Sequence, residues 1–374
     1  GLSSTDDGGV TWKRIGGYDA STYDLGWIHP DIQDIHVLGE HIWVATDGGL
    51  NYSNDELSTH ESRKYGIYNA THWGYAQGWN SDVQAGGRYH NGNMGFRQDF
   101  GLGNQLRLGG AERPTGYINP LDDNMLHFSD IGDKRLPDSF SGTPSAIPNL
   151  SLYPNEEYSD SRSSELVYDP LYADWIALGK ESVFYRSFNN GWTFEAYHDF
   201  GSGKVLEIEQ GRSNRDLFYA VVYDGSCTLN KSTDGGNTWE LISGLPAFWW
   251  KMELALNPAN DDDVWVIKAD DDDIRRSLDG GVTWTDFGDG LQNEQLRDVV
   301  CLGNAGTVVV SQTNAFHRAT GENSWTSFDS GAPALWTPYE CIPFYRDAVL
   351  RVGDKGKGIW QADFPFVPAP IAQP

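Results

Sequence analysis

Residues 232–239 have the sequence Ser-Thr-Asp-Gly-Gly-Asn-Thr-Trp, and residues 277–284 have the closely similar sequence Ser-Leu-Asp-Gly-Gly-Val-Thr-Trp. Their closing tryptophans, Trp239 and Trp284, are 45 residues apart (284 − 239). One such octapeptide could arise by chance, whereas two copies at this spacing indicate a repeated unit. Strand- and turn-rich repeats of about 40 to 50 residues are typical of propellers, and periods of about 20 to 35 are typical of solenoids.

The octapeptide has the chemistry of a tight turn that leads into a strand. Ser and Asp side chains accept hydrogen bonds from backbone N–H groups a few positions later, and paired glycines permit a positive φ. The Thr and Trp that follow favour a strand, and the indole offers a large apolar face to a neighbour. We therefore predict structural roles for Asp234, Asp279, Trp239 and Trp284.

Degenerate copies extend the repeat. Residues 5–12 keep the motif except for its first Ser, which gives Asp7 and Trp12 the same structural positions. Residues 187–194 replace Asp by Asn and Trp by Phe, and residues 53–55 (Ser-Asn-Asp) are a shorter remnant. The repeat therefore covers most of the chain.

Short apolar stretches before each turn predict the strands of one repeat. Residues 205–208, 217–223 and 228–231 precede Asp234, and three similar stretches precede Asp279. Each repeat then has three strands, the Asp-Gly-Gly turn and a fourth strand, which together make a four-stranded antiparallel blade.

We expect an all-β fold, a single β-propeller over residues 1–364 with seven or eight blades, eight being the preferred number, and the octapeptide turns on its outer strands. Residues 1–17 would complete the last blade beside residues 349–364, which removes exposed strand edges. The polar, Pro- and Ser-rich residues 131–160 are expected to form an inter-blade loop. Residues 365–374 are expected to be a Pro-rich linker to a further module.

The charge of the chain excludes some partners. Its 374 residues include 53 acidic and 27 basic ones, a formal net charge of −26, which repels phosphate backbones and anionic membrane surfaces. We expect no nucleic-acid partner.

The acidic surface serves either solubility or cation binding. Calcium has a candidate place in the acidic run at residues 270–273, but this run lacks the alternating ligands and the glycine of an EF-type loop, so no cofactor is predicted.

The three cysteines, Cys227, Cys301 and Cys341, lie in apolar, strand-like stretches and allow one disulfide at most. We expect buried free thiols. No stretch approaches the ~18 consecutive apolar residues of a membrane span.

The octapeptides resemble the Asp-box (BNR) repeats of sialidases, xyloglucanases and sortilin-type propellers. In those families the motif lies on the outer turn of each blade, away from the ligand face, which implies a structural role here.

A second resemblance is to exported propellers of Bacteroidetes-like bacteria, which often precede immunoglobulin-like or PKD modules and a type 9 secretion signal. It implies a secreted or cell-surface bacterial protein that meets secretion or surface-anchoring machinery through a C-terminal module. The residues that carry it are 29–35, 44–50, 342–347 and 356–360.

Three polar stretches depart from the pattern of those relatives. Gln33 stands where they have the second histidine of His-x-Asp-x-His, residues 89–92 are Tyr-His-Asn-Gly instead of Gln-Asp-Asn-Gly, and residues 109–112 are Gly-Gly-Ala-Glu instead of Gly-Asp-Gly-Gly. Without the second imidazole, His29 and Asp31 fall short of the three or more protein ligands of a metal site. We predict no metal there.

Asp47 is the candidate catalytic residue, because its Thr-Asp-Gly-Gly setting resembles the stretch that carries the base in xyloglucanases. The same four residues also describe an ordinary blade turn. A glycosidase needs two carboxyls about 5 to 9.5 Å apart, and the sequence names no partner for Asp47. Sialidase chemistry would require an Arg-Ile-Pro motif before the repeats, which the sequence lacks.

Aromatic side chains beside hydrogen-bonding groups suit sugars or peptides, although the same residues can pack between blades. We expect a non-catalytic recognition or structural module of a larger exported protein that binds a glycan or a protein. The alternative is a glycoside hydrolase, xyloglucanase-like, that uses Asp47. The candidate ligand-binding residues are His29, Asp31, Trp73, Tyr75, Trp79, Arg88, Tyr89, His90 and Arg113.

Overall fold

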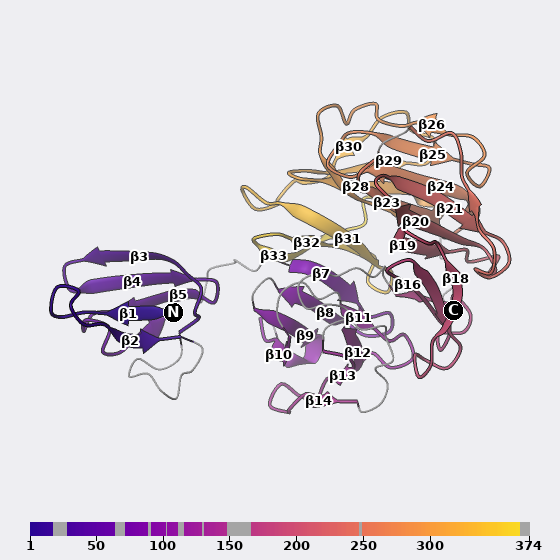
Figure 1. The fold of residues 1–374 in the computed structure, drawn as a ribbon. Helices are drawn as coiled ribbons and strands as arrows, with labels where there is room; N and C mark the ends of the chain where they lie inside the picture. The colour runs from indigo at the N-terminus through magenta and orange to yellow at the C-terminus, as the bar shows by residue number, and fades with distance from the viewer. Residues whose placement is uncertain are drawn as a thin grey trace. The chain divides into compact units, whose positions relative to one another are not determined.

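The computed structural model describes residues 1–17, 28–63, 72–88, 91–101, 103–110, 116–128, 131–147, 166–246 and 249–366. These residues form antiparallel β-sheets, with two 3-10 turns at Gln98–Phe100 and Gly303–Ala305. The described residues include no helix with the length and apolar character needed to cross a membrane. The chain divides into two compact units, unit 1 (Gly1–Asn69) and unit 2 (Ala70–Pro374), where we expected one (Figure 1).

Unit 1 contains a two-stranded and a four-stranded sheet. Strand β1 (Leu2–Ser4) pairs with β2 (Lys13–Gly16), and the octapeptide copy at residues 5–12 joins them. The second sheet has the order β3 (Ile32–Leu38), β4 (His41–Thr46), β5 (Gly49–Ser53) and β6 (Glu61–Ser62).

In its described part, unit 2 has seven sheets, each a run of strands consecutive in sequence. The strands, sheet by sheet, are β7 (His72–Gln77), β8 (Val83–Arg88), β9 (Gly92–Arg97) and β10 (Leu106–Gly109); β11 (Gly116–Ile118), β12 (Met125–Phe128), β13 (Lys134–Arg135) and β14 (Ser145–Ala146); β15 (Val167–Tyr168), β16 (Ile176–Lys180), β17 (Val183–Ser187) and β18 (Glu195–Asp199); β19 (Lys204–Gln210), β20 (Phe218–Tyr223), β21 (Cys227–Ser232) and β22 (Glu240–Leu241); β23 (Met252–Asn257), β24 (Asn260–Lys268), β25 (Ile274–Ser277) and β26 (Thr285–Asp286); β27 (Leu296–Cys301), β28 (Gly306–Ser311), β29 (Ala315–Ala319) and β30 (Thr326–Ser327); and β31 (Pro338–Phe344), β32 (Val349–Asp354) and β33 (Gly358–Asp363).

These seven sheets form a closed ring (Figure 1). Going round it, β7 contacts β11, β16 contacts β19, β19 contacts β23, β23 contacts β27, β27 contacts β31, and β31 contacts β7 again. A hydrogen bond connects the second and third sheets: the Asn119 side-chain amide donates to Asn190 Oδ1 at 2.5 Å. Apolar side chains fill the space between neighbouring sheets. One such layer joins Tyr219 and Val221 of β20 to Leu254 of β23 and Val266 of β24.

Side chains of the last sheet and the first sheet close the ring. Glu340 on β31 accepts the Tyr75 backbone N–H of β7 at 3.1 Å. The Arg351 guanidinium of β32 donates to both carboxylate oxygens of Asp82, at 2.6 and 2.8 Å, and also to the Gln77 side chain. Arg351 and Asp82 are both buried.

In the described residues of unit 1, β1 pairs with β2, and in those of unit 2, β33 pairs with β32. The pairing of the two chain ends in one blade stays a prediction, while one other region differs from the expectation. Within the expected loop at 131–160, β13 and β14 complete a blade-like sheet, and residues 148–160 lie outside the described residues. The three cysteines are free and buried, as expected, and burial raises the pKa of the Cys227 thiol to about 12.

The octapeptide turns are closed by their own side chains. Asp234 accepts the Thr238 N–H at 2.9 Å and the Thr238 hydroxyl at 2.6 Å, while Ser232 Oγ accepts the Gly236 N–H at 2.9 Å. The turn at Asp279 has the same three bonds. The hydrogen bonds from Thr238 favour the ionised carboxylate and lower the pKa of Asp234 to about 2.

The turns also connect neighbouring sheets. The Gly235 carbonyl accepts a hydrogen bond from Arg186 of the preceding sheet at 3.1 Å, and the Gly280 carbonyl accepts one from Lys231 at 2.9 Å. The Trp239 ring lies 5.2 Å from the ring of Phe184, again in the preceding sheet. In unit 1, by contrast, Trp12 is 65% exposed.

We expect Gly236→Ala to destabilise unit 2 far more than Gly281→Ala. Both glycines have positive φ, +88° and +94°, so a methyl group costs each about 1 to 2 kcal/mol. At Gly236 the new Cβ would also overlap the Phe184 ring, which adds about 1 to 3 kcal/mol. At Gly281 the nearest atom is 3.2 Å away, on the flexible Ile242 side chain. Urea unfolding followed by tryptophan fluorescence measures the difference, and equal losses would contradict this account.

We expect the double substitution Asp234→Asn and Asp279→Asn to change the acid dependence of stability. Hydrogen bonds from Thr238 and Thr283 lower the pKa of the two carboxyls to about 2 in the folded chain, below the ordinary value of 3.8. Their contribution to stability is therefore complete above that ordinary value and disappears as the pH falls through about 2. The native turn at Asn189, whose amide contacts Thr193 at 2.9 and 3.0 Å, shows that asparagine fits this position.

Thermal unfolding of the chain and of the double variant at about pH 6 and about pH 2.5 provides the measurement. The gap between their midpoints should narrow at the lower pH. A gap that is constant with pH would mean that these carboxylates contribute nothing through their charge.

Candidate functional site

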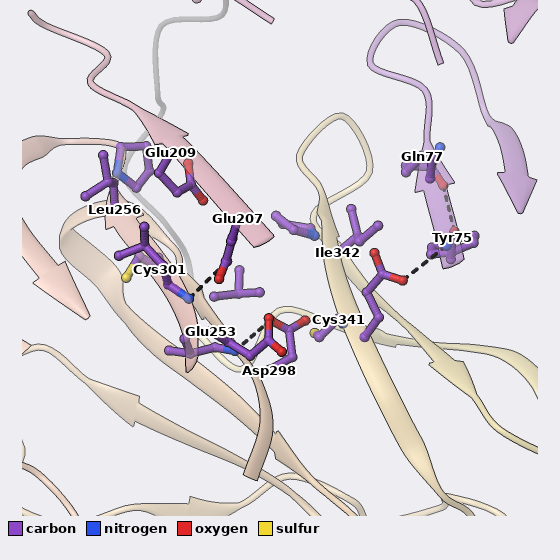
Figure 2. A pocket seen from close by; sticks show the side chains of 18 of the residues that line it. Tyr75, Gln77, Glu207, Glu209, Glu253, Leu256, Asp298, Cys301, Cys341 and Ile342 are labelled. Atoms are coloured by element: carbon purple, nitrogen blue, oxygen red, sulfur yellow. Dashed lines mark hydrogen bonds between the residues drawn. The ribbon is translucent and has the colours of Figure 1, made fainter. Parts of the chain in front are cut away.

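The first strands of the sheets of unit 2 surround a pocket of about 560 Å³. Its wall is formed by residues of β7, β11, β15, β19, β23, β27 and β31, by Asp261 of β24, and by residues that lie beside the ends of some of these strands. Figure 2 shows side chains from several sheets around this space. The pocket therefore lies where the ring of sheets converges.

Four carboxylates in the wall occupy equivalent places on consecutive first strands: Glu207 on β19, Glu253 on β23, Asp298 on β27 and Glu340 on β31. They are 46 (253 − 207), 45 (298 − 253) and 42 (340 − 298) residues apart, which is the period of the repeat. The pairing register shifts directly before Glu207, Asp298 and Glu340. Such bulges turn a side chain away from the regular alternation of a strand.

Three of these carboxylates connect one sheet to the next. Glu207 accepts the Leu254 N–H at 2.9 Å, and Asp298 accepts the Cys341 N–H at 2.6 Å (Figure 2). The Glu340 bond to Tyr75 that closes the ring has the same form. The acidic wall is therefore part of the framework as well as part of the pocket.

One end of the pocket is aromatic. Trp79, Tyr345 and Arg212 each follow the end of a first strand, so all three lie at the same end of the ring. The Trp79 and Tyr345 rings are stacked, with centroids 6.3 Å apart and planes at 15°, and the Arg212 guanidinium lies 5.6 Å from the Trp79 ring. Both aromatic side chains are half-buried, which leaves part of each ring for a ligand.

Cationic groups lie near the beginnings of the first strands. Arg297 lines the pocket and pairs with Asp270, and the Lys355 ammonium lies 4.1 Å from the ring of Tyr339. Burial raises the pKa of Tyr339 to about 12, so this residue is a neutral hydrogen-bonding group at physiological pH. The pocket thus offers aromatic faces, carboxylate acceptors and two guanidinium groups, a combination that suits hydroxyl-rich or polar ligands.

The sequence-predicted residues of unit 2 are partly in this pocket. Tyr75 and Trp79 line it, and the buried Tyr75 hydroxyl donates to Gln77 Oε1 at 3.1 Å. Trp73 lies on β7 and Arg88 on β8, with side chains outside the described part of the chain. The remaining three candidates lie outside the described residues: Tyr89, His90 and Arg113.

The other predicted residues belong to unit 1, where the structure brings them together. The side chains of His29 and Asp31 are 3.7 Å apart, and the Asp47 N–H donates to the Asp31 carbonyl at 3.1 Å. The Gln33 amide donates to Asp47 Oδ1 at 2.5 Å. Within the described residues, no three His, Cys, Asp or Glu side chains are placed to hold a metal ion. One group that contacts the Asp47 carboxylate is thus the amide of Gln33, the residue that departs from the pattern of the relatives.

Sequence reasoning missed the four wall carboxylates. Their signal is present, because an acid recurs at the same place in successive repeats with the spacing of the octapeptides. It is hidden by the large number of other acidic residues in the chain.

No family model and no curated protein matches the sequence, but solved structures match the fold. The chain is similar to the GH74 enzyme of Niastella koreensis, with 16% identity over 88% of this chain and a TM-score of 0.53, and it spans 58% of that enzyme's length. A catalytically inactive virginiamycin B lyase from Staphylococcus aureus with quinupristin matches at 12% identity, 79% of this chain, 95% of that chain and a TM-score of 0.57. YCF48 bound to D1 peptide matches at 13% identity, 91% and 94% coverage and a TM-score of 0.48. The GH74 enzyme and the virginiamycin B lyase are β-propeller proteins, and together with the antiparallel sheets they support a β-propeller fold for this chain.

Proposed function

We propose that this chain is a non-catalytic recognition module in which unit 2 is a seven-bladed propeller and its central pocket binds an oligosaccharide. The observation that carries the proposal is the stacked pair Trp79 and Tyr345 beside Arg212, at one end of a pocket lined by carboxylates. Sugar rings pack on aromatic faces, and their hydroxyls donate to carboxylates.

The bonding of the wall carboxylates favours binding over catalysis. A glycoside hydrolase needs one carboxyl that delivers a proton to the leaving group. In the pocket, Glu207, Asp298 and Glu340 instead accept backbone N–H groups of neighbouring sheets. The rival function, hydrolysis with Asp47, has one supporting observation, the resemblance of its Thr-Asp-Gly-Gly setting.

The proposal also covers the type of repeat and the location of the protein. The octapeptide turns, with their Ser, Asp and Thr hydrogen bonds, support assignment to the Asp-box type. The similarity to exported propellers and the net charge of −26 support a secreted or cell-surface bacterial protein. Secretion or anchoring machinery would then be a partner, and the proposal includes no cofactor.

Binding of the purified chain to an oligosaccharide array, followed by fluorescence titration with the best oligosaccharide, tests the proposal. Trp79→Ala and Arg212→Ala should each weaken binding about tenfold or more, because each removes a surface that contacts the sugar. Trp192→Ala is the matched control, since this tryptophan is 47% exposed and lies on an octapeptide turn away from the pocket.

Three outcomes would overturn the proposal. One is oligosaccharide binding that Trp79→Ala leaves intact. Another is a protein ligand, with no response on the oligosaccharide array. The third is release of reducing ends from a polysaccharide that Asp47→Asn abolishes, which would establish the hydrolase.

A further inference from the structure

The sheet β3–β6 of unit 1 has the same design as the sheets of unit 2. The pairing register shifts directly before Asp34, as it does before Asp298. Asp34 accepts the N–H of the next residue, Ile35, at 2.9 Å, as Asp298 accepts that of Val299 at 2.7 Å. Ile35 therefore occupies the position that Val299 occupies in unit 2.

The exposed fraction of the side chain at this position differs between unit 1 and unit 2. In unit 2 it is 2 to 4% exposed on five first strands, at Tyr75, Ile208, Leu254, Val299 and Cys341. In unit 1, Ile35 is 44% exposed, and Val37, two residues along the same face, is 59% exposed. This apolar strand face is therefore covered on five first strands of unit 2, whereas it is exposed in the described part of unit 1.

Unit 2 shows what covers this face. Val299 and Cys301 of β27 pack in one cluster with Ala255 of β23 and Trp265 of β24. These are the first and second strands of the preceding sheet. The cover is thus the inner two-stranded hairpin of a neighbouring blade.

In unit 1 the described part of the preceding sheet consists of β1 and β2. In unit 2 the octapeptide turn joins the third and fourth strands, as β25 and β26 show, so β1 and β2 correspond to a third and a fourth strand. Strand β25 pairs on both edges, with β24 and β26. Strand β1 pairs with β2 on one edge, and the described residues show no strand on its other edge.

We propose that unit 1 is an acceptor for a β-hairpin of the kind that forms the inner half of a propeller blade. The second strand of the hairpin adds antiparallel to the open edge of β1, and its first strand lies over Ile35 and Val37. Main-chain pairing and apolar burial supply the affinity, as in other cases of strand addition.

The chemistry of the partner follows from the open surfaces. It has two strands joined by a tight turn, with alternating apolar residues on one face. The segment 252–268 of this chain has these features, with a turn at Pro258 and Trp265 on the apolar face. A synthetic peptide of this sequence is therefore the probe.

Fluorescence anisotropy of the labelled peptide with the full 374-residue chain measures binding. We expect saturable binding that Ile35→Glu and Val37→Glu each weaken about tenfold or more, because each places a charge in the apolar contact. Both side chains are exposed, so neither change should disturb folding. Val282→Glu is the matched control, since Val282 is 72% exposed on a turn of unit 2, and it should leave binding unchanged.

Hydrogen exchange of the same complex locates the peptide. New protection of the β1 amides at residues 2–4 is expected. Absence of saturable binding, binding that Ile35→Glu does not weaken, or protection confined to unit 2 would each overturn the proposal. The last outcome would mean that the peptide exchanges with its own copy in β23 and β24.

Discussion

The ring of unit 2 depends on the contact between its last and first sheets. Most neighbouring sheets of the ring are also neighbours in the sequence, but β7 contacts β31, more than 260 residues later (338 − 72 = 266). The buried pair Arg351 and Asp82 fixes this contact with two hydrogen bonds. Removing one member of such a pair leaves an uncompensated buried charge, which costs about 3 to 5 kcal/mol. The pair therefore specifies which sheets meet, in addition to holding them together.

Around the ring, the same kinds of contact recur because the repeats place the same residue types at the same positions. A cation directly before the octapeptide, Arg186 or Lys231, bonds to a glycine carbonyl in the next turn. Arg276 has the same place, but the following repeat keeps only Ser-Trp at Trp325 and lacks the paired glycines. Arg276 instead makes two 2.8 Å bonds to Asp263 within its own sheet. Loss of a motif in one repeat thus changes the partner of a residue in the repeat before it.

The fold could be predicted where local chemistry determines it. The octapeptides identify a turn between two outer strands, and their spacing gives the repeat, because both depend on residues close in sequence. The closure of unit 2 on itself could not be predicted, since it depends on the contact of β31 with β7. Strands β13 and β14 were missed because each has two residues in a polar, proline-containing stretch. In the candidate site, Tyr75 and Trp79 were identified as aromatic groups beside polar ones, whereas Glu207 and its equivalents look like ordinary surface acids in a chain with 53 acidic residues.

The wall carboxylates line the pocket and also connect neighbouring sheets, and these two roles limit which substitutions the protein can tolerate. Glu207, Asp298 and Glu340 face the pocket and at the same time bond to the backbone of the adjoining sheet. A substitution there that alters ligand preference also weakens the framework. Trp79 and Arg212 follow the strands, and within the described part of the chain no side-chain hydrogen bond joins them to the backbone of another sheet, whereas the Tyr345 hydroxyl donates to the Cys301 carbonyl of β27 at 3.4 Å. A change of ligand preference should therefore cost less stability at Trp79 or Arg212 than at the acids, where it also removes a hydrogen bond between sheets.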